Sequence, residues 1–224
     1  MSIQKQDAAS IKVAIPGVSG VGKSTLFEKL VRKAKARWKF LFDHKHGDLS
    51  RRFEVPACYT VDDLDASAER GGYVIFDPGK MYPGKPDDGF KFFCDYVFAL
   101  CSVFKGKKLF GSDELDNLTE TSRDPDELLV ILDQGRTFEI ECFFIAQGMN
   151  SINNKARKQF TEIFAFRQGD ANGVGWLVDK GYDADALMAL KNGEFIYKNL
   201  NTGETKTGGK AFQPKNAGRD LSGL

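Results

Sequence analysis

Short apolar runs alternate along the chain with longer segments in which apolar residues recur every three to four positions. Runs rich in β-branched and aromatic residues that end at Gly, Pro or Asp are typical of buried strands, whereas the longer period is typical of helices with one buried face. The pattern predicts strands at residues 10–15, 38–42, 73–76, 107–112, 139–146 and 162–167. It predicts helices at residues 25–37, 90–104, 125–134, 151–160 and 184–191, and a β-hairpin at residues 194–207.

Strands that alternate with helices predict a mainly parallel sheet, because each helix carries the chain back to the edge where the next strand begins. We therefore expect an α/β fold in three layers, α/β/α, with a mainly parallel central sheet and a C-terminal β-hairpin. Residues 1–207 are expected to form one domain. Residues 208–224 are rich in Gly, Lys and Asn without periodicity, and we expect them to form a flexible tail.

One apolar run, residues 128–132, resembles both a strand and a helix. The sequence L-L-V-I-L followed by Asp133 is typical of a buried strand, but its flanks are typical of a helix. Asp124 suits an N-cap, Pro125 suits the first helical position, and Gly135 suits the end. We therefore predict a helix at 125–134.

The charge balance is nearly neutral, with 32 Lys and Arg against 31 Asp and Glu in 224 residues. This argues against a nucleic-acid binder that relies on a bulk positive field, but not against one that gathers a few basic loops on one surface.

The longest apolar segment, residues 90–104, is interrupted by Lys91 and Asp95. It is shorter than the roughly 20 residues of a membrane span, so no membrane-spanning segment is expected. Four cysteines without a C-x-x-C spacing favour reduced core cysteines of a cytosolic protein.

A glycine-rich loop between the first strand and the following helix carries the clearest chemical signal. The sequence G-V-S-G-V-G-K-S-T at 17–25 matches the phosphate-binding pattern G-x-x-x-x-G-K-S/T. Backbone N–H groups of such a loop surround phosphates, Lys23 brings a cation to the β- and γ-phosphates, and the Ser24 hydroxyl is a Mg²⁺ ligand. The predicted nucleotide-binding residues are Gly17, Ser19, Gly20, Val21, Gly22, Lys23, Ser24 and Thr25.

Hydrolysis of a bound nucleotide also requires an acidic site at the end of another strand. Residues 128–133 have Gln134 where a water-activating carboxylate is expected, and their flanks predict a helix. We therefore favour Asp113 as a Mg²⁺ ligand and Glu114 as the residue that activates water, the alternative being a solvated acidic turn. Gln147 directly follows the strand at 139–146, where a polar side chain of a central parallel strand points into the ligand crevice.

These pieces together resemble the FtsK/HerA superfamily of ring-forming DNA-pumping ATPases. The matching segments are the glycine-rich loop, F-L-F-D-H-K-H-G-D at 40–48, S-D-E-L at 112–115, Q-G-R at 134–136 and F-F-I-A-Q at 143–147. Within that superfamily, the chain in its small size and bare ATPase core most resembles the genome-packaging ATPases of tailless, membrane-containing icosahedral phages (tectivirus type) and their archaeal virus relatives. The resemblance implies a P-loop NTPase (RecA/ASCE-like) fold, ATP and Mg²⁺, double-stranded DNA, a homo-oligomeric ring (a hexamer), capsid vertex proteins as partners, and a location in the virion and host cytoplasm.

The resemblance also implies roles for single residues. Asp43, at the end of the second strand, matches an acidic active-site position. Arg136 is similar to the arginine that reaches the nucleotide of the neighbouring subunit, with Arg157 and Arg167 as the alternatives. The strand before the acidic pair contains a glycine and a serine and is less hydrophobic than is usual in the superfamily.

Other functions stay open at this point. A P-loop switch or small-molecule kinase would act as a monomer without DNA, but the sequence has neither an Arg-rich lid nor the N-K-x-D guanine motif. A scaffold subunit that binds ATP without turnover would not need Glu114. A related DNA pump could serve phage export or plasmid transfer. His44 and His46 share one face of an extended segment and suggest a metal site, against a simple loop beside the nucleotide.

Overall fold

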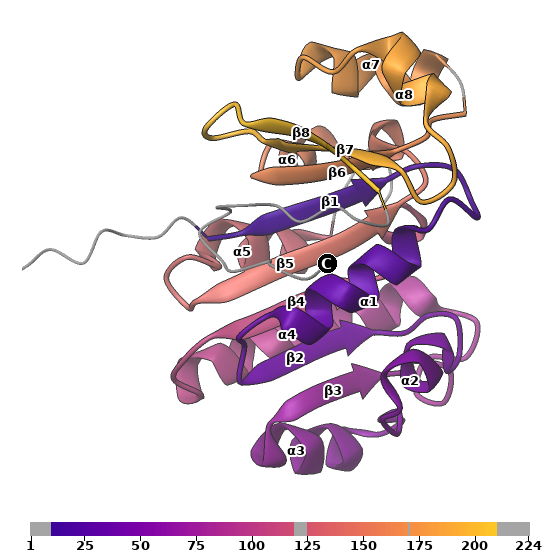
Figure 1. The fold of residues 1–224 in the computed structure, drawn as a ribbon. Coiled ribbons are helices and arrows are strands. Elements are labelled where there is room, and N and C mark those ends of the chain that lie inside the picture. Colours follow the sequence, from indigo (N-terminus) through magenta and orange to yellow (C-terminus); the bar gives the residue numbers. More distant parts are fainter. Residues whose placement is uncertain (1–9, 119–124, 170, 210–224) are drawn as a thin grey trace, which may run out of the picture.

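In a computed structural model, which describes residues 10–118, 125–169 and 171–209, eight strands form one sheet in the order β3-β2-β4-β5-β1-β6-β7-β8 (Figure 1). All neighbours from β3 to β6 are parallel, and β6, β7 and β8 pair antiparallel. The strands are β1 (Lys12–Pro16), β2 (Trp38–Phe42), β3 (Gly72–Phe76), β4 (Lys108–Ser112), β5 (Ile140–Ala146), β6 (Glu162–Phe166), β7 (Phe195–Asn199) and β8 (Thr205–Gly208).

Helices cover both faces of the sheet, so the predicted three-layer α/β/α arrangement is confirmed (Figure 1). The helices are α1 (Lys23–Lys33), α2 (Asp48–Phe53), α3 (Val61–Arg70), α4 (Pro86–Val103), α5 (Asp126–Gln134), α6 (Asn154–Arg157), α7 (Ala171–Asp179) and α8 (Ala184–Ala189), with 3-10 turns η1 (Leu115–Asn117) and η2 (Met149–Ser151). Apolar residues of α1 and α2 pack on one face of the sheet, and those of α4 and α5 pack on the other. No helix within the described ranges is long and apolar enough to cross a membrane.

The predicted strands and hairpin are confirmed to within two residues at each end. The ambiguous run at 128–132 is helical, as its flanks predict; Asp124 lies outside the described residues. The helix predicted at 151–160 is wrong in extent. Asn153 caps a helix of only four residues by accepting from the amide of Lys155, and the chain then enters the core at Phe160, which is 3% exposed. Residue 208, where the flexible tail is predicted to begin, is the last residue of β8, and residues 210–224 of the predicted tail lie outside the described ranges.

Among the described residues, three helices were not predicted, namely α2, α3 and α7. The helix α3 is short and mostly polar, with Leu64 and Ala68 as its buried apolar positions, so it shows little periodicity. Its N-terminus nevertheless has a sequence signal, because Thr60 and Asp63 form a capping box. The helix α7 contains two glycines, which are poor helix formers and conceal it in the sequence.

Candidate nucleotide-binding site

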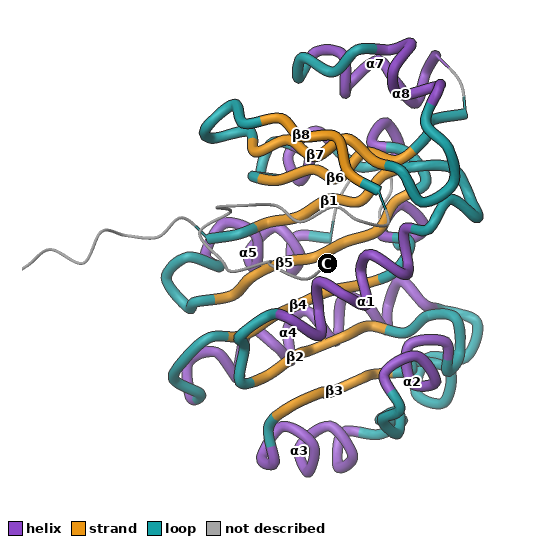
Figure 2. Tube along the Cα trace, viewed as in Figure 1, coloured by secondary structure: helices purple, strands orange, loops and turns teal. Residues whose placement is uncertain are grey.

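The glycine-rich loop joins β1 to α1 at the edge of the sheet where the parallel strands end (Figure 2). Gly22 is the N-cap of α1 with a φ of 108°, a left-handed conformation that other residues rarely adopt. A Cβ atom at Gly17 would lie 2.7 Å from Cβ of Phe166, so the loop packs directly against β6. The loop therefore ends at a helix N-terminus, whose amides lack partners within the helix and suit a phosphate. All the predicted nucleotide-binding residues lie in this loop and the first turn of α1.

The Lys23 side chain folds back into the loop. Lys23 is 8% exposed, and its Nζ donates hydrogen bonds to the carbonyl oxygens of Gly17 (2.5 Å) and Val18 (2.8 Å). Burial lowers the pKa of Lys23, and the nearby negative charge of Asp113 opposes that shift. A bound phosphate would compete with the two carbonyl oxygens for this ammonium group.

The predicted acidic pair directly follows β4, which is separated from β1 by the inserted strand β5. Parallel pairing brings the ends of these three strands to one edge, so Asp113 and Glu114 lie at the same edge as the glycine-rich loop. Asp113 is 4% exposed and its charge acts on Lys23. The low hydrophobicity of β4 has a packing cause, because a Cβ atom at Gly111 would lie 2.7 Å from the carbonyl oxygen of Phe143.

A lysine that the sequence pattern did not indicate bridges the acidic pair. Lys45 Nζ lies 3.3 Å from Asp113 Oδ2 and 2.5 Å from Glu114 Oε1. On the other side of the same carboxylate, Asn117 Nδ2 donates to Glu114 Oε2 at 2.7 Å, and His44 Nε2 lies 3.5 Å from that oxygen. Burial lowers the pKa of Lys45, but hydrogen bonding to Glu114 and the charges of both acids outweigh this, so its pKa rises above the ordinary value.

The loop after β2 is fixed by two buried aspartates. Asp43 is 2% exposed, and its Oδ2 accepts hydrogen bonds from the amides of Leu49 (2.9 Å) and Ser50 (3.3 Å) at the start of α2. Burial raises the pKa of Asp43, although these hydrogen bonds oppose the shift. His46 Nδ1 lies 3.0 Å from Asp77 Oδ1, so the two histidines of the loop face different carboxylates. The Oδ2 atom of Asp43 therefore caps the N-terminal amides of α2.

Gln147 directly follows β5 at the predicted edge of the sheet and is exposed. Its backbone amide donates to Asp116 Oδ2 at 2.9 Å, and Ser151 Oγ donates to the same oxygen at 3.3 Å. Burial raises the pKa of Asp116. Asp116 lies in the turn after the acidic pair and was not singled out in the sequence. It ties that turn to the end of β5, which places Gln147 relative to the pair.

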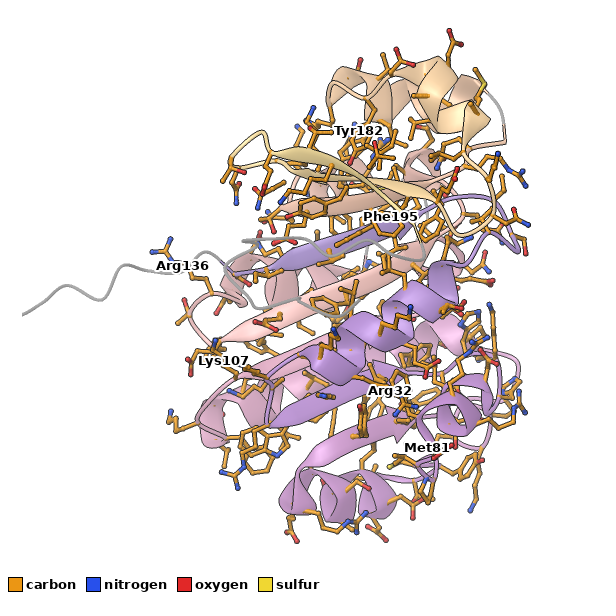
Figure 3. All side chains as sticks on the ribbon, viewed as in Figure 1. Arg32, Met81, Lys107, Arg136, Tyr182 and Phe195 are labelled. Atoms are coloured by element: carbon orange, nitrogen blue, oxygen red, sulfur yellow. The ribbon has the colours of Figure 1, made fainter. Side chains whose placement is uncertain are left out.

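The three candidate arginines lie in different places. Arg136 lies between α5 and β5, at the edge of the sheet where the parallel strands begin, together with Lys107 (Figure 3). It therefore does not contribute to the glycine-rich loop of its own chain. Arg167 follows β6, and its carbonyl oxygen accepts from the amide of Val18 in the loop at 3.0 Å. Arg157 Nη2 donates to Asn154 Oδ1 at 2.7 Å.

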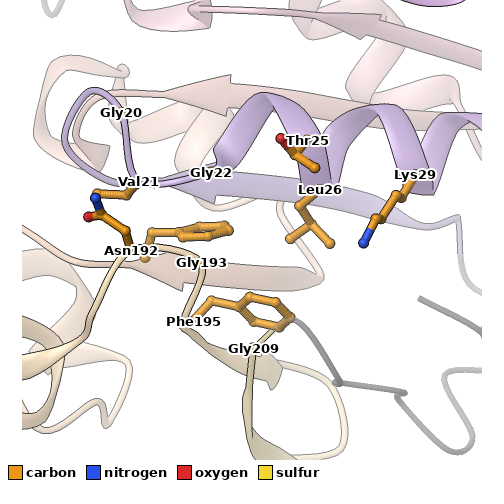
Figure 4. Close-up of a pocket in the computed structure, with 11 residues that line it drawn as sticks. Gly20, Val21, Gly22, Thr25, Leu26, Lys29, Asn192, Gly193, Phe195 and Gly209 are labelled. Atoms are coloured by element: carbon orange, nitrogen blue, oxygen red, sulfur yellow. The ribbon is translucent and has the colours of Figure 1, made fainter.

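A cavity of about 300 Å³ opens beside the loop, between α1 and the turn that leads into β7 (Figure 4). Leu26 and Phe195 are among its apolar walls, and Thr25 and Asn192 supply polar groups. The amide of Gly193 donates to the carbonyl oxygen of Val21 at 2.8 Å, which fastens the turn to the loop. No sequence motif marks this cavity, because its two walls are separated by more than 160 residues.

A glycine-rich loop after β1, an inserted strand and an acidic pair at the end of the next strand define the P-loop NTPase fold with an added central strand. The chain is similar to the genome packaging NTPase B204 of Sulfolobus turreted icosahedral virus 2, with a TM-score of 0.70, 18% identity, and 88% of this chain and 95% of that one covered. That NTPase was also solved with AMPPCP and with ATP-γ-S. This chain is also similar to B204, the DNA-packaging ATPase of Sulfolobus turreted icosahedral virus, with a TM-score of 0.62, 19% identity, and 88% of this chain and 96% of that one covered.

VirB4 of Thermoanaerobacter pseudethanolicus shares the fold at 10% identity, with a TM-score of 0.60 and 92% and 90% of the two chains covered. No family model matches the sequence, and no curated protein matches it. At these identities the likeness shows the fold. The expected P-loop NTPase fold is thereby confirmed, and the likeness to these ATPases is a likeness of fold.

Proposed function

We propose that the protein is an ATPase that translocates double-stranded DNA and packages a viral genome into a preformed capsid. One observation carries the proposal. The phosphate-binding loop with Lys23 and the acidic pair Asp113 and Glu114 lie at one edge of a sheet whose architecture matches viral genome-packaging NTPases. The NTPase B204 was solved with ATP analogues, which favours ATP as the nucleotide.

Each part of the site has a chemical role in this proposal. The loop amides and Lys23 hold the phosphates, and Ser24 with Asp113 supplies the hydroxyl and carboxylate oxygens that Mg²⁺ prefers. The Mg²⁺ ion, when bound, neutralises charge on the phosphates. Glu114 accepts a proton from the attacking water, and Gln147 senses the γ-phosphate. For Asp43 we propose the acidic active-site role through the oxygen that does not hold α2.

The same proposal includes a homo-oligomeric ring, a hexamer, seated on capsid vertex proteins in the virion and formed in the host cytoplasm. Arg136 lies at the edge of the sheet away from its own loop, so it can serve hydrolysis only at a neighbouring subunit's nucleotide. Such an arginine neutralises transition-state charge only in the assembled ring. Arg167 and Arg157 are the alternatives for this role.

The cavity beside α1 is the proposed site of the nucleotide base, because it adjoins the phosphate-binding loop and combines apolar walls with polar groups. Burying about 100 Å² of a base stabilises binding by roughly 2–3 kcal/mol. We therefore expect ADP to displace a fluorescent ATP analogue about 30- to 150-fold better than pyrophosphate does. Equal displacement by the two compounds would show that the cavity is not used.

Measurement of ATP hydrolysis with and without double-stranded DNA tests the proposed function against its rivals. We expect DNA to increase the steady-state rate, because a translocase couples each hydrolysis to a step along its substrate. A scaffold subunit would bind ATP without turnover. A monomeric kinase or switch would show a rate that DNA does not change, and either result would reject the translocase.

A further inference from the structure

Lys45 contacts both of the acids that the proposed hydrolysis requires. Its Nζ lies 2.5 Å from Glu114 Oε1 and 3.3 Å from Asp113 Oδ2. The Asp113 side chain is 5% exposed and the Lys45 side chain 36%, so the lysine reaches the buried acid from the solvent side. Its ammonium group is thus a counter-ion at the carboxylate that we assign to Mg²⁺.

The carboxylate of Glu114 has partners on both oxygens. Lys45 binds Oε1, and Oε2 accepts from Asn117 and lies 3.5 Å from His44. Glu114 has a φ of 57°, a left-handed conformation that is unfavourable for a glutamate and persists where its surroundings hold it. A carboxylate whose two oxygens already contact Lys45 and Asn117 is less available to accept a proton from water.

We propose that Lys45 is a positioning residue that restrains Glu114 and competes with Mg²⁺–nucleotide for the acidic pair. The inference rests on the proposed hydrolysis by Glu114. The lysine has a flexible four-carbon stem, so it can leave the acids when an incoming phosphate offers a second anionic partner. When Lys45 moves to the phosphate, Glu114 becomes available to the attacking water. Before the nucleotide binds, Lys45 keeps Glu114 from water.

The test replaces Lys45 by Met, which keeps the length of the side chain and removes its charge, and by Arg, which keeps the charge. Two quantities are measured, namely the basal rate of ATP hydrolysis without DNA and the Mg²⁺ concentration that half-saturates binding of a fluorescent ADP analogue. Lys107→Met is the matched control, because Lys107 is exposed at the opposite edge of the sheet (Figure 3). Circular dichroism checks that each variant folds.

For Lys45→Met we expect the basal rate to rise and the half-saturating Mg²⁺ concentration to fall, each on the order of 2- to 30-fold, as two partly exposed ion pairs are lost. Lys45→Arg and Lys107→Met should stay close to the unmodified protein. A lower rate in Lys45→Met with an unchanged Mg²⁺ requirement would overturn the inference and indicate direct binding of phosphate. Values equal to those of the unmodified protein would overturn it too. If the unmodified protein binds ADP but does not hydrolyse ATP, the proposed function fails, and the Mg²⁺ titration still decides the role of Lys45.

Discussion

Replacement of Glu114 by glutamine is expected to lower the rate of ATP hydrolysis by about 10²- to 10⁴-fold, the usual contribution of a positioned general base. Glutamine has almost the same shape but cannot accept the proton of the attacking water. Its amide can still accept a hydrogen bond from Lys45, so the turn after β4 should keep its structure. Nucleotide binding should change little, because the glycine-rich loop and Lys23 are untouched. Phosphate release gives the rate, and a fluorescent ADP analogue gives the affinity.

The matched control is Glu139→Gln, an exposed glutamate at the edge where the strands begin. Its activity should equal that of the unmodified protein. Hydrolysis by Glu114→Gln at the rate of the control would mean that another group activates water, or that the acidic turn is only a solvated surface feature. A scaffold subunit predicts instead that neither variant nor the unmodified protein hydrolyses ATP.

The second large effect is expected at Lys23, because its ammonium group is the cation held within the glycine-rich loop. Lys23→Ala removes charge-assisted hydrogen bonds to two phosphate groups, each worth about 1.5–3 kcal/mol. We therefore expect ATP to bind about 10²- to 10⁴-fold more weakly and hydrolysis to be lost at ordinary ATP concentrations. Equilibrium binding of a fluorescent, non-hydrolysable ATP analogue measures the loss. Lys35→Ala, an exposed lysine beyond the end of α1, is the control, and equal affinities in the two variants would contradict the assignment.

Much of the fold could be predicted because local patterns agree with it. The parallel strands are short, mostly buried runs, and α5 has helical flanks although its centre resembles a strand. The shorter helices were missed for physical reasons. Two glycines conceal α7, and α3 has few buried apolar positions, although its capping box was visible at Thr60 and Asp63. The helix predicted at 151–160 fails because burial of Phe160 ends it early.

The site could be predicted only where its chemistry is contiguous in the sequence. The glycine-rich loop and the pair Asp113 and Glu114 are such segments, and both lie at the expected edge of the sheet. The pairing of Lys45 with that acidic pair joins residues 68 positions apart and depends on β2 lying beside β4. The cavity beside α1 depends on a turn near the C-terminal hairpin. Neither the Lys45 contact nor this cavity can be inferred from the sequence without knowing the order of the strands in the sheet.

The nearly neutral charge of the chain fits a DNA motor only if a few basic groups, repeated around a ring, contact the DNA phosphates.

The central claim is that ATP hydrolysis drives movement of the protein along DNA. Displacement of a third strand from a DNA triplex measures this movement most directly. We predict that the protein with ATP and Mg²⁺ releases the third strand, and that Glu114→Gln with the same nucleotide does not. Release without ATP, or no release by a protein that hydrolyses ATP in the presence of DNA, would contradict it.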